Sequence, residues 1–274
     1  MLQEEFVLLR DFIYEKSGIF YTEGKKYLLE NRLKNRLVET GAGSFENYYY
    51  YIRYSDPRGR ELYRLFDVVT TNETYFFRNQ KQLESFKHLV RRLVEQPAAL
   101  SPLRIWSAGC ATGEEAYTLA IMLDQLSEEM SREIPYIISA TDISVNSLEA
   151  AKRGIFGDYA MRHVPEGLRD RYFTFQNGGY FIKDEMKKYV RIDFMNLNDL
   201  ASYRKYSEMD VIFCRNVLIY FDEAAKKKVI DSLFDCLRPG GYLAVGHSEM
   251  LYPFSRSFKP IPAEGAGLYV KRLE

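Results

Sequence analysis

A strand, a turn and a helix between residues 103 and 126 constrain the fold more than any other part of the sequence. The apolar run Leu103–Ala108 passes into a turn that contains Gly109 and Gly113, and two glutamates then open an amphipathic helix. In an open α/β sheet, ligands bind at the carboxyl ends of the strands, and small turn residues let a ligand approach the backbone closely. We therefore expect a cofactor at this turn, against Gly109.

The acidic residues Glu114 and Glu115 restrict the kind of cofactor. A dinucleotide site holds a pyrophosphate at a bare helix N-terminus, and two negative charges there would repel it. The GxGxxG pattern of such sites is also missing. A cationic ligand without phosphate suits the turn, and S-adenosylmethionine, with its sulfonium and ammonium groups, meets that description. The glycine spacing alone is also typical of a tight turn that binds nothing.

Asp142 is a second candidate for a ligand contact. It follows the apolar run Tyr136–Ala140, and Ser144 is placed as the N-cap of the next predicted helix. An acid at the end of the second strand can accept hydrogen bonds from ribose hydroxyls, as in nucleoside-binding α/β domains. The alternative is that Asp142 only closes the turn or caps the helix.

Strands and helices alternate from about Pro102 onward, which is typical of a parallel sheet covered on both faces. Residues 172–186, with Gln176-Asn177-Gly178-Gly179 at their centre, predict an added β-hairpin. A long helix is predicted from Asp222, with Pro239-Gly240 as its stop. The expected strands are 103–108, 136–140, 189–193, 210–214, 242–246 and 268–271.

Helical spacing dominates the chain before about Phe66, where two predicted helices end at Gly18 and Gly41. We expect an all-helical domain and a linker at residues 1–79. An α/β, Rossmann-like S-adenosylmethionine-dependent methyltransferase domain is expected at residues 80–274, with a small β-subdomain at about 172–188. Lys25, Arg32 and Arg36 fall on one face of the second helix. Such a basic face is typical of a solvated surface, or of one that docks an acidic partner.

Composition excludes several classes of function. Lys plus Arg and Asp plus Glu are equal at 38 each, so no basic field indicates a nucleic-acid partner. The N-terminus does not resemble a signal peptide, and no apolar run approaches the roughly 18 residues that span a bilayer. We expect a cytoplasmic monomer without membrane insertion. The three cysteines, at 110, 214 and 236, and the three histidines predict neither disulfides nor a metal site.

Four motifs together resemble the CheR family of chemotaxis receptor methyltransferases, and the resemblance covers nearly the whole chain. They occur in the family's order, and the chain also has the family's terminal VGHSE turn at Val245–Glu249. The motifs are TTNETYFFRN at residues 70–79, SAGCATGEEAYTLA at 107–120, ATDIS at 140–144 and FCRNVLIYFD at 213–222.

The resemblance implies transfer of a methyl group from S-adenosylmethionine to glutamate side chains of chemoreceptors. It makes Arg78 and Tyr220 the candidates that orient the acceptor carboxylate. At least two of Tyr75, Phe76 and Phe77 are expected to pack the domains together, and Cys214 is expected to form part of the pocket wall rather than a nucleophile. The residues it places against the cofactor, besides Gly109, are Asn72, Thr74, Arg78, Glu115, Asp142, Asn196, Leu197, Cys214 and Arg215.

Ala111 and Ala116 depart from the family pattern, which commonly has Ser and Pro at these positions, so cofactor affinity is expected to differ somewhat. The basic helix face resembles the family's receptor-binding surface. The predicted hairpin corresponds to a subdomain that captures a receptor tail peptide in some members, and its short turn favours a member that does not depend on tail capture.

Two other functions remain open at this point. One is a methyltransferase of the same fold acting on another signalling protein or on a small molecule. The other is a noncatalytic adaptor that senses the cofactor or its product.

Overall fold

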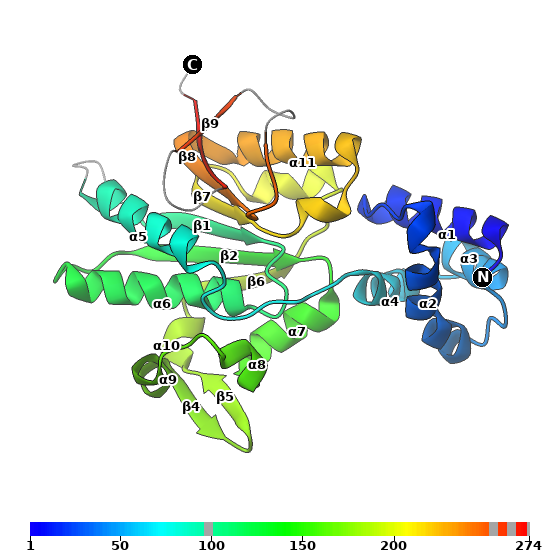
Figure 1. Cartoon of the computed structure of the whole chain (residues 1–274), viewed down its shortest axis with the longest axis horizontal. Helices are drawn as coiled ribbons and strands as arrows, with labels where there is room; N and C mark the ends of the chain where they lie inside the picture. Colours follow the sequence, from blue (N-terminus) through cyan, green and yellow to red (C-terminus); the bar gives the residue numbers. More distant parts are fainter. Residues whose placement is uncertain (96–100, 252–256, 262–266, 273–274) are drawn as a thin grey trace.

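A seven-stranded sheet, in the order β6-β2-β1-β7-β8-β10-β9, forms the centre of the larger domain (Figure 1). The computed structural model describes residues 1–95, 101–251, 257–261 and 267–272. The first five strands of this order are parallel, and β10 runs antiparallel to both of its neighbours. The strands are β1 (Leu103–Ala108), β2 (Tyr136–Asp142), β6 (Val190–Phe194), β7 (Met209–Cys214), β8 (Leu237–Val245), β9 (Phe258–Pro260) and β10 (Leu268–Lys271).

Strand β1 lies at the point where the strand order reverses, because β2 and then β6 follow on one side and β7 and β8 on the other. The carboxyl end of such a switch point is where open α/β sheets bind ligands. The helices of this domain are α5 (Gln80–Val94), α6 (Glu114–Glu129), α7 (Val145–Arg153) and α11 (Glu223–Cys236). The predicted strand, turn and helix therefore stand where a ligand site is expected.

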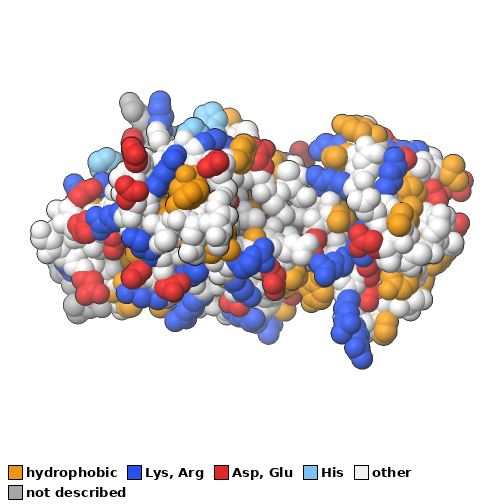
Figure 2. All heavy atoms as spheres, turned by 90° about the horizontal axis from the view of Figure 1, so that it is seen from below, with side chains coloured by type: hydrophobic (Ala, Val, Ile, Leu, Met, Phe, Trp, Pro, Cys, Tyr) orange, Lys and Arg blue, Asp and Glu red, His pale blue; other side chains and the backbone are white. Residues whose placement is uncertain are grey.

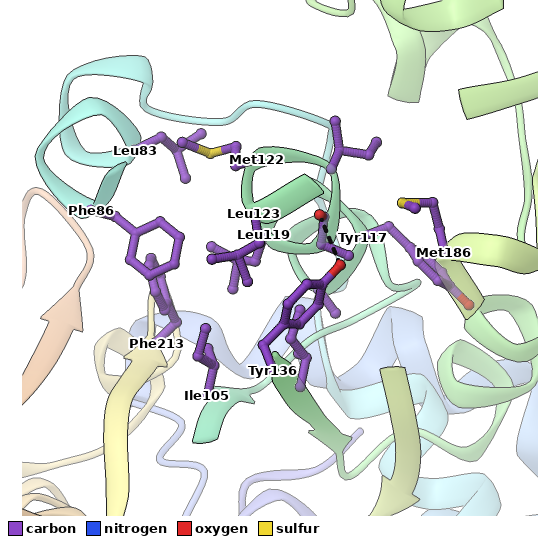
Figure 3. Packing of buried hydrophobic residues seen from close by; sticks show 14 of the residues in the cluster. Leu83, Phe86, Ile105, Tyr117, Leu119, Met122, Leu123, Tyr136, Met186 and Phe213 are labelled. Atoms are coloured by element: carbon purple, nitrogen blue, oxygen red, sulfur yellow. Dashed lines mark hydrogen bonds between the residues drawn. The ribbon is translucent and has the colours of Figure 1, made fainter. Parts of the chain in front are cut away.

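The sheet is buried against apolar side chains on both faces. On one face, α5 and α6 pack onto β1, β2 and β7 through Phe86, Leu119 and Phe213 (Figure 3). The Tyr136 hydroxyl in this core donates a 3.1 Å hydrogen bond to the backbone carbonyl of Ala120. On the other face, α11 and part of the helical domain share a second cluster with Trp106. The strands read as continuous apolar runs because both of their faces are covered.

The end of α11 differs from the prediction. The helix ends at Cys236, and β8 begins at once, so Pro239 and Gly240 lie inside the strand. Between the pairs Met209–Leu237 and Val211–Tyr242 the register shifts. Residues 238–241 bulge out of the pairing, which accommodates a proline and a glycine at φ 72° within a strand. The short edge strand β9 was not predicted.

A second sheet of three strands, β3-β5-β4, forms the small β-subdomain below the main sheet (Figure 1). The predicted hairpin is confirmed, with Asn177 and Gly178 at positive φ in a two-residue turn. The subdomain also includes β3, which begins at residue 155, well before the expected start. Its elements are β3 (Ile155–Phe156), α8 (Asp158–Met161), α9 (Glu166–Tyr172), β4 (Phe173–Gln176), β5 (Gly179–Ile182) and α10 (Asp184–Lys187).

The N-terminal domain lies beside the carboxyl ends of the parallel strands (Figure 1). A short bridge ties it to the sheet domain, where Ile19 pairs with Phe221 and the Phe20 N–H donates to the Tyr220 carbonyl at 2.9 Å. Asp67 accepts hydrogen bonds from the Ser144 hydroxyl at 2.8 Å and the Asn146 N–H at 3.0 Å. The domain consists of α1 (Gln3–Ser17), α2 (Lys26–Thr40), α3 (Phe45–Tyr54) and α4 (Arg60–Val69).

The linker between the domains is anchored to the small β-subdomain. Phe76 is fully buried, with ring contacts to Phe156 and Phe173, and its N–H donates to the Ala160 carbonyl at 3.0 Å. Phe77 packs against the core of the sheet domain. Both aromatics pack on the sheet domain and its small β-subdomain, and neither of these contacts reaches the helical domain, so the expectation that they pack the domains together stays a prediction.

Candidate functional site

A cavity of about 1010 Å³, including its open mouth, lies between the linker and the carboxyl ends of the strands. This size is in the range of small-molecule and cofactor sites. The turn after β1, the end of β2 and the segments after β6 and β7 form its floor, while linker residues 70–78 cover it. Ser17 and Ile19 of the helical domain complete the wall. The cavity therefore gathers side chains from both domains.

Gly109 occupies a position that only glycine fits well. Its φ is +88°, and a Cβ there would lie 2.3 Å from a methyl carbon of Val217. The Gly109 N–H donates to the Thr141 carbonyl at 2.8 Å, which fixes the turn to the end of β2. The bare backbone that the sequence predicted at this turn lies on the cavity wall.

Glu115 lies on the cavity wall and takes part in a buried ion pair. Its carboxylate accepts from the Ser107 hydroxyl at 2.6 Å and from the Arg215 guanidinium at 3.3 Å. Burial raises the pKa of Glu115, and Arg215 and the Ser107 hydrogen bond partly counter that effect. Burial likewise lowers the pKa of Arg215, and the negative charge of Glu115 opposes it. The two charges stabilise each other within the wall.

Arg215 keeps one unused donor beside the cavity. Its side chain is 4% exposed, and one terminal nitrogen donates to the Arg78 carbonyl at 2.6 Å. Its Nε has no hydrogen-bond partner among the described residues. Buried donors are nearly always satisfied, so an unpartnered one indicates a missing acceptor. This donor fits a ligand that carries a carboxylate or another acceptor.

Asp142 lines the cavity and also closes the turn. One carboxylate oxygen accepts from the Ala111 N–H and the other from the Ser144 N–H, both at 2.9 Å. Asp142 therefore does close the turn, which was the alternative left open from the sequence. A carboxylate has about four lone-pair positions, so two backbone bonds leave acceptor capacity for a ligand. Burial raises the pKa of Asp142, and the hydrogen bonds from backbone N–H groups oppose that rise.

The linker contributes Asn72, Thr74 and Arg78 to the lining of the same cavity. The Arg78 guanidinium donates to the Glu73 carbonyl at 2.8 Å and lies 5.6 Å from the centre of the Tyr75 ring. It forms no ion pair with a carboxylate in the part of the chain that the structure describes. Arg78 is half-buried, and its planar group of donors remains free to bind a carboxylate ligand.

Tyr220 lies in a short 3-10 turn, Leu218–Tyr220, after β7 and lines the same cavity. Asn196 and Leu197 also line it. The Asn196 amide, however, donates to the Lys16 carbonyl at 2.6 Å, and its oxygen accepts from Asn198 N–H at 2.9 Å. Its side chain therefore ties the helical domain to the sheet domain as well as facing the cavity.

Cys214 differs from its predicted place. It is fully buried in the apolar cluster under α11 and is not among the residues that line the cavity. Burial raises the pKa of its thiol well above the ordinary value. As the last residue of β7, it projects into the core, and the chain reaches the cavity only at Arg215.

Sequence reasoning missed several cavity residues. Ser17 and Ile19 reach the wall only because the helical domain docks there, and no local pattern indicates that contact. Asn216 and Val217 directly follow a predicted site residue, so their position beside Arg215 was the available signal. Ile143 and Met195 similarly follow the ends of β2 and β6.

The predicted basic face of α2 is not a continuous free surface. Arg36 is buried and paired with Glu61, whose carboxylate accepts both an Nε bond at 2.8 Å and a terminal-nitrogen bond at 2.6 Å. Arg32 holds the linker through Thr71 and the Val69 carbonyl. Only Lys25 of the three is exposed. The prediction is wrong for Arg36 because a buried guanidinium requires a carboxylate partner, which α4 supplies.

Both signs of charge are interspersed on the face shown in Figure 2, across the sheet domain and the helical domain. Among the described residues, no helix has the length and apolarity needed to cross a membrane. The same residues contain no group of three or more His, Cys, Asp or Glu side chains arranged to hold a metal ion. The candidate ligand site is the cavity at the carboxyl ends of the strands, which is large enough for an organic cofactor.

The sheet order, the turn at the switch point and the acid after β2 define an α/β domain with a nucleoside-type cavity. Family models agree with this class: the CheR methyltransferase all-alpha domain matches residues 4–70, and the CheR methyltransferase SAM binding domain matches residues 72–266. These two matches span nearly the whole chain. The chain belongs to the CheR methyltransferase family, and S-adenosylmethionine (SAM) is its cofactor.

Relatives support the same assignment. "Chemotaxis protein methyltransferase 2" of Vibrio cholerae is 36% identical over 93% of this chain and 88% of its own length. "Chemotaxis protein methyltransferase" of Borreliella burgdorferi is 34% identical over 91% of this chain and 89% of its own length. The N-methyltransferase NodS of Bradyrhizobium japonicum, solved with S-adenosyl-l-homocysteine, covers 70% of this chain and 88% of its own at a TM-score of 0.40 and 13% identity. This similarity is too low to support any conclusion about this chain.

The residues of the cavity fit SAM on structural grounds. The Gly109 turn leaves room where a side chain would clash, and Asp142 retains acceptor capacity for hydroxyl groups. The unpartnered Nε of Arg215 can serve the amino-acid carboxylate of such a ligand. Two of the charged residues in the wall, the buried Asp142 and the partly buried Glu115, are negative, which suits a ligand with a sulfonium and an ammonium group.

Proposed function

We propose that this protein forms γ-methyl esters on glutamate side chains in the cytoplasmic helices of chemoreceptors. The observation that carries the proposal is that one cavity is lined both by the buried charges of Asp142 and Arg215 and by two further groups, Arg78, which forms no ion pair among the described residues, and Tyr220. When bound, SAM supplies a methyl group on a positively charged sulfur. The names of the relatives support a role in chemotaxis.

Arg78 and Tyr220 are the groups that hold the acceptor. A free glutamate side chain has a pKa near 4.3, so at neutral pH it arrives as a carboxylate and needs no general base. The chain has to place that carboxylate rather than activate it. Alignment of this kind can contribute several kcal/mol. The half-buried Arg78 has donors to spare, and the cavity carboxylates already accept hydrogen bonds from the protein.

Too strong a pairing with Arg78 would reduce the nucleophilicity of the acceptor carboxylate. The position of Arg78 limits this effect, because its guanidinium already bonds a backbone carbonyl and contacts the Tyr75 ring. Tyr220 adds a single neutral donor. Together they can fix the orientation of the carboxylate without burying it in a full ion pair.

The decisive experiment incubates the protein with radiolabelled SAM and receptor-bearing membranes. Label on a receptor that is released by mild alkali identifies a methyl ester, because esters hydrolyse under conditions that leave N-methyl groups intact. Receptors whose target glutamates are replaced by alanine serve as the control. Alkali-stable label, or label only on other proteins or on small molecules, contradicts the proposal.

The short hairpin turn at Asn177-Gly178 supports recognition that does not depend on a receptor tail peptide. Calorimetry with a tail peptide measures this directly, and micromolar binding would contradict it. Cytoplasmic location and action as a monomer stay predictions.

A further inference from the structure

The terminal turn Val245–Glu249 contains a buried glutamate for which the proposed reaction has no role. Glu249 is 6% exposed, and it forms no ion pair within the described residues. A buried carboxylate without a cation is costly unless several donors satisfy it. Such a group in a loop beside the cavity requires an explanation.

Three backbone N–H groups converge on this carboxylate. One oxygen accepts from Gly246 N–H at 2.6 Å and from Asn216 N–H at 2.8 Å, and the other accepts from Ile219 N–H at 3.1 Å. Only the Gly246 bond lies within the turn itself. The other two reach a segment about thirty residues earlier in the chain. Glu249 therefore holds a second loop and does more than close its own turn.

The loop that it holds lines the cavity with residues on both sides of the anchored positions, including Arg215 and Tyr220. Asn216 directly follows Arg215, and Ile219 directly precedes Tyr220, so the two anchored N–H groups flank the segment between these site residues. Asn216 has a φ of +59°, a left-handed conformation that asparagine tolerates better than most residues but that still favours a loop held by its surroundings. We propose that Glu249 is a positioning residue that sets the loop between Arg215 and Tyr220 for methyl transfer, an inference that rests on the proposed function.

The surroundings of Glu249 are shaped to admit the carboxylate. A Cβ on Gly246 would lie 2.5 Å from a Glu249 oxygen and 3.0 Å from the Asn216 nitrogen. The base of the turn is fixed by the Gln82 side chain, which donates to the Val245 carbonyl at 2.8 Å. Glycine at 246 therefore leaves the space in which the carboxylate meets the loop.

A carboxylate suits this role better than an amide. It accepts only, and charge-assisted hydrogen bonds are roughly twice as strong as neutral ones. Glutamine of the same shape would turn an NH₂ donor toward at least one of the three N–H groups. That mismatch leaves buried donors unsatisfied and loosens the loop.

The test compares Glu249→Gln and Gly246→Ala with the matched control His247→Gln, an exposed residue of the same turn. Both test variants should speed hydrogen–deuterium exchange of the amides of Asn216 and Ile219. Both should lower kcat for label transfer to receptor by about 10- to 100-fold. Calorimetric affinity for S-adenosylhomocysteine should change by less than about threefold, because Gly109 and Asp142 stay in place and Arg215 is held independently by Glu115 and the Arg78 carbonyl. The control should match the wild type.

A purely structural role predicts a different result. Amide exchange, kcat, cofactor-product affinity and the thermal midpoint would then all worsen together, and this outcome overturns the inference. Wild-type exchange and wild-type kcat in Glu249→Gln also overturn it. Gly246→Ala keeps the carboxylate and only displaces it, so it provides the second variant if Glu249→Gln folds poorly.

A double-variant comparison identifies the route of the effect. If Glu249 acts through Tyr220, Glu249→Gln should lower kcat less in a Tyr220→Phe background than in the wild type. Strictly multiplicative losses overturn that route.

A wild-type protein that binds S-adenosylhomocysteine but labels no receptor contradicts the proposed acceptor. In that case amide exchange of the loop alone decides the role of Glu249.

Discussion

The two walls of the cavity differ in how far their polar side chains are already hydrogen-bonded within the protein. The sheet wall, which we define as Gly109, Glu115, Asp142 and Arg215, is buried at Asp142 and Arg215 and partly buried at Gly109 and Glu115. The polar groups of its side chains bond mostly to one another or to the backbone. The linker wall, which we define as Asn72, Thr74 and Arg78 of the linker together with Tyr220 of the turn after β7, is partly buried, and Arg78 has no carboxylate partner among the described residues. A fixed, charged wall suits a small cofactor that is always the same, whereas a wall with unused donors suits an acceptor on another protein.

This difference predicts which substitutions affect cofactor binding and which affect methyl transfer. Changes in the sheet wall should lower cofactor affinity first, because that wall cannot rearrange without breaking buried hydrogen bonds. Changes in the linker wall should lower transfer and leave cofactor binding measurable. Three variants test this division, and a fourth tests a charge beside the sheet wall.

Gly109→Ala should have the largest effect. The new Cβ would meet Val217 at 2.3 Å and would sit at a φ of +88°. Strain and overpacking together should lower the free energy of unfolding by about 4 kcal/mol. Because Val217 also lines the cavity, its displacement should in addition lower the affinity for S-adenosylhomocysteine measured by calorimetry. The matched control is Gly43→Ala, at a φ of +73° with nothing within 4 Å. Equal losses of affinity in both variants would mean that backbone strain, and not the cavity wall, is responsible.

Arg78→Ala comes next. Removal of the acceptor-orienting donors should lower receptor labelling by about 100-fold, while calorimetry still detects binding of the cofactor product. Arg162→Ala is the control, since Arg162 also stacks on the Tyr75 ring, at 3.5 Å from its centre, but does not line the cavity. Unchanged labelling in Arg78→Ala would remove Arg78 from the linker wall's function.

Tyr220→Phe should have a smaller effect because it deletes one hydroxyl and keeps the ring. The Phe20 bond to the Tyr220 backbone carbonyl is untouched. Loss of one hydrogen bond to a charged acceptor should lower kcat by about tenfold, with cofactor affinity preserved. The exposed Tyr27→Phe serves as the control. A loss of cofactor affinity without a loss of kcat would assign Tyr220 to the opposite wall.

Glu114→Gln should have the smallest effect, and it tests a charge beside the sheet wall. Burial raises the pKa of Glu114 above its ordinary value of 4.5, so ionisation costs the folded state stability at neutral pH. That cost disappears as the pH falls through the raised pKa toward 4.5. Glutamine removes it at every pH. The variant's advantage in thermal midpoint should therefore shrink on acidification, and a pH-independent difference would refute the raised pKa.

The sequence indicated the sheet wall better than the linker wall. The turn after β1 was predictable because its signals are local: an apolar strand, glycines and an acidic helix start within sixteen residues of one another. The strands 103–108 and 268–271 have the predicted bounds. The two-residue strand β3 could not be predicted, since two residues show no periodicity.

The errors arise where tertiary contacts decide. Helical spacing placed Arg32 and Arg36 on one face, but only the docking of α4 buries Arg36 against Glu61, twenty-five residues away. Motif position placed Cys214 at the site, whereas the direction of its side chain depends on how β7 packs under α11. Ser17 and Ile19 join the wall from another domain. Local pattern carries no information about these contacts.

The bridge between Ile19 and Phe221, with its bond from Phe20 to Tyr220, has a mechanical consequence. The helical domain is hydrogen-bonded to the backbone of Tyr220, the residue that is expected to orient the acceptor carboxylate. If the two bodies hinge apart to exchange spent cofactor, the tyrosine is drawn away in the same movement. The conformation that lets the cofactor exchange would then be one in which Tyr220 is displaced and methyl transfer does not occur.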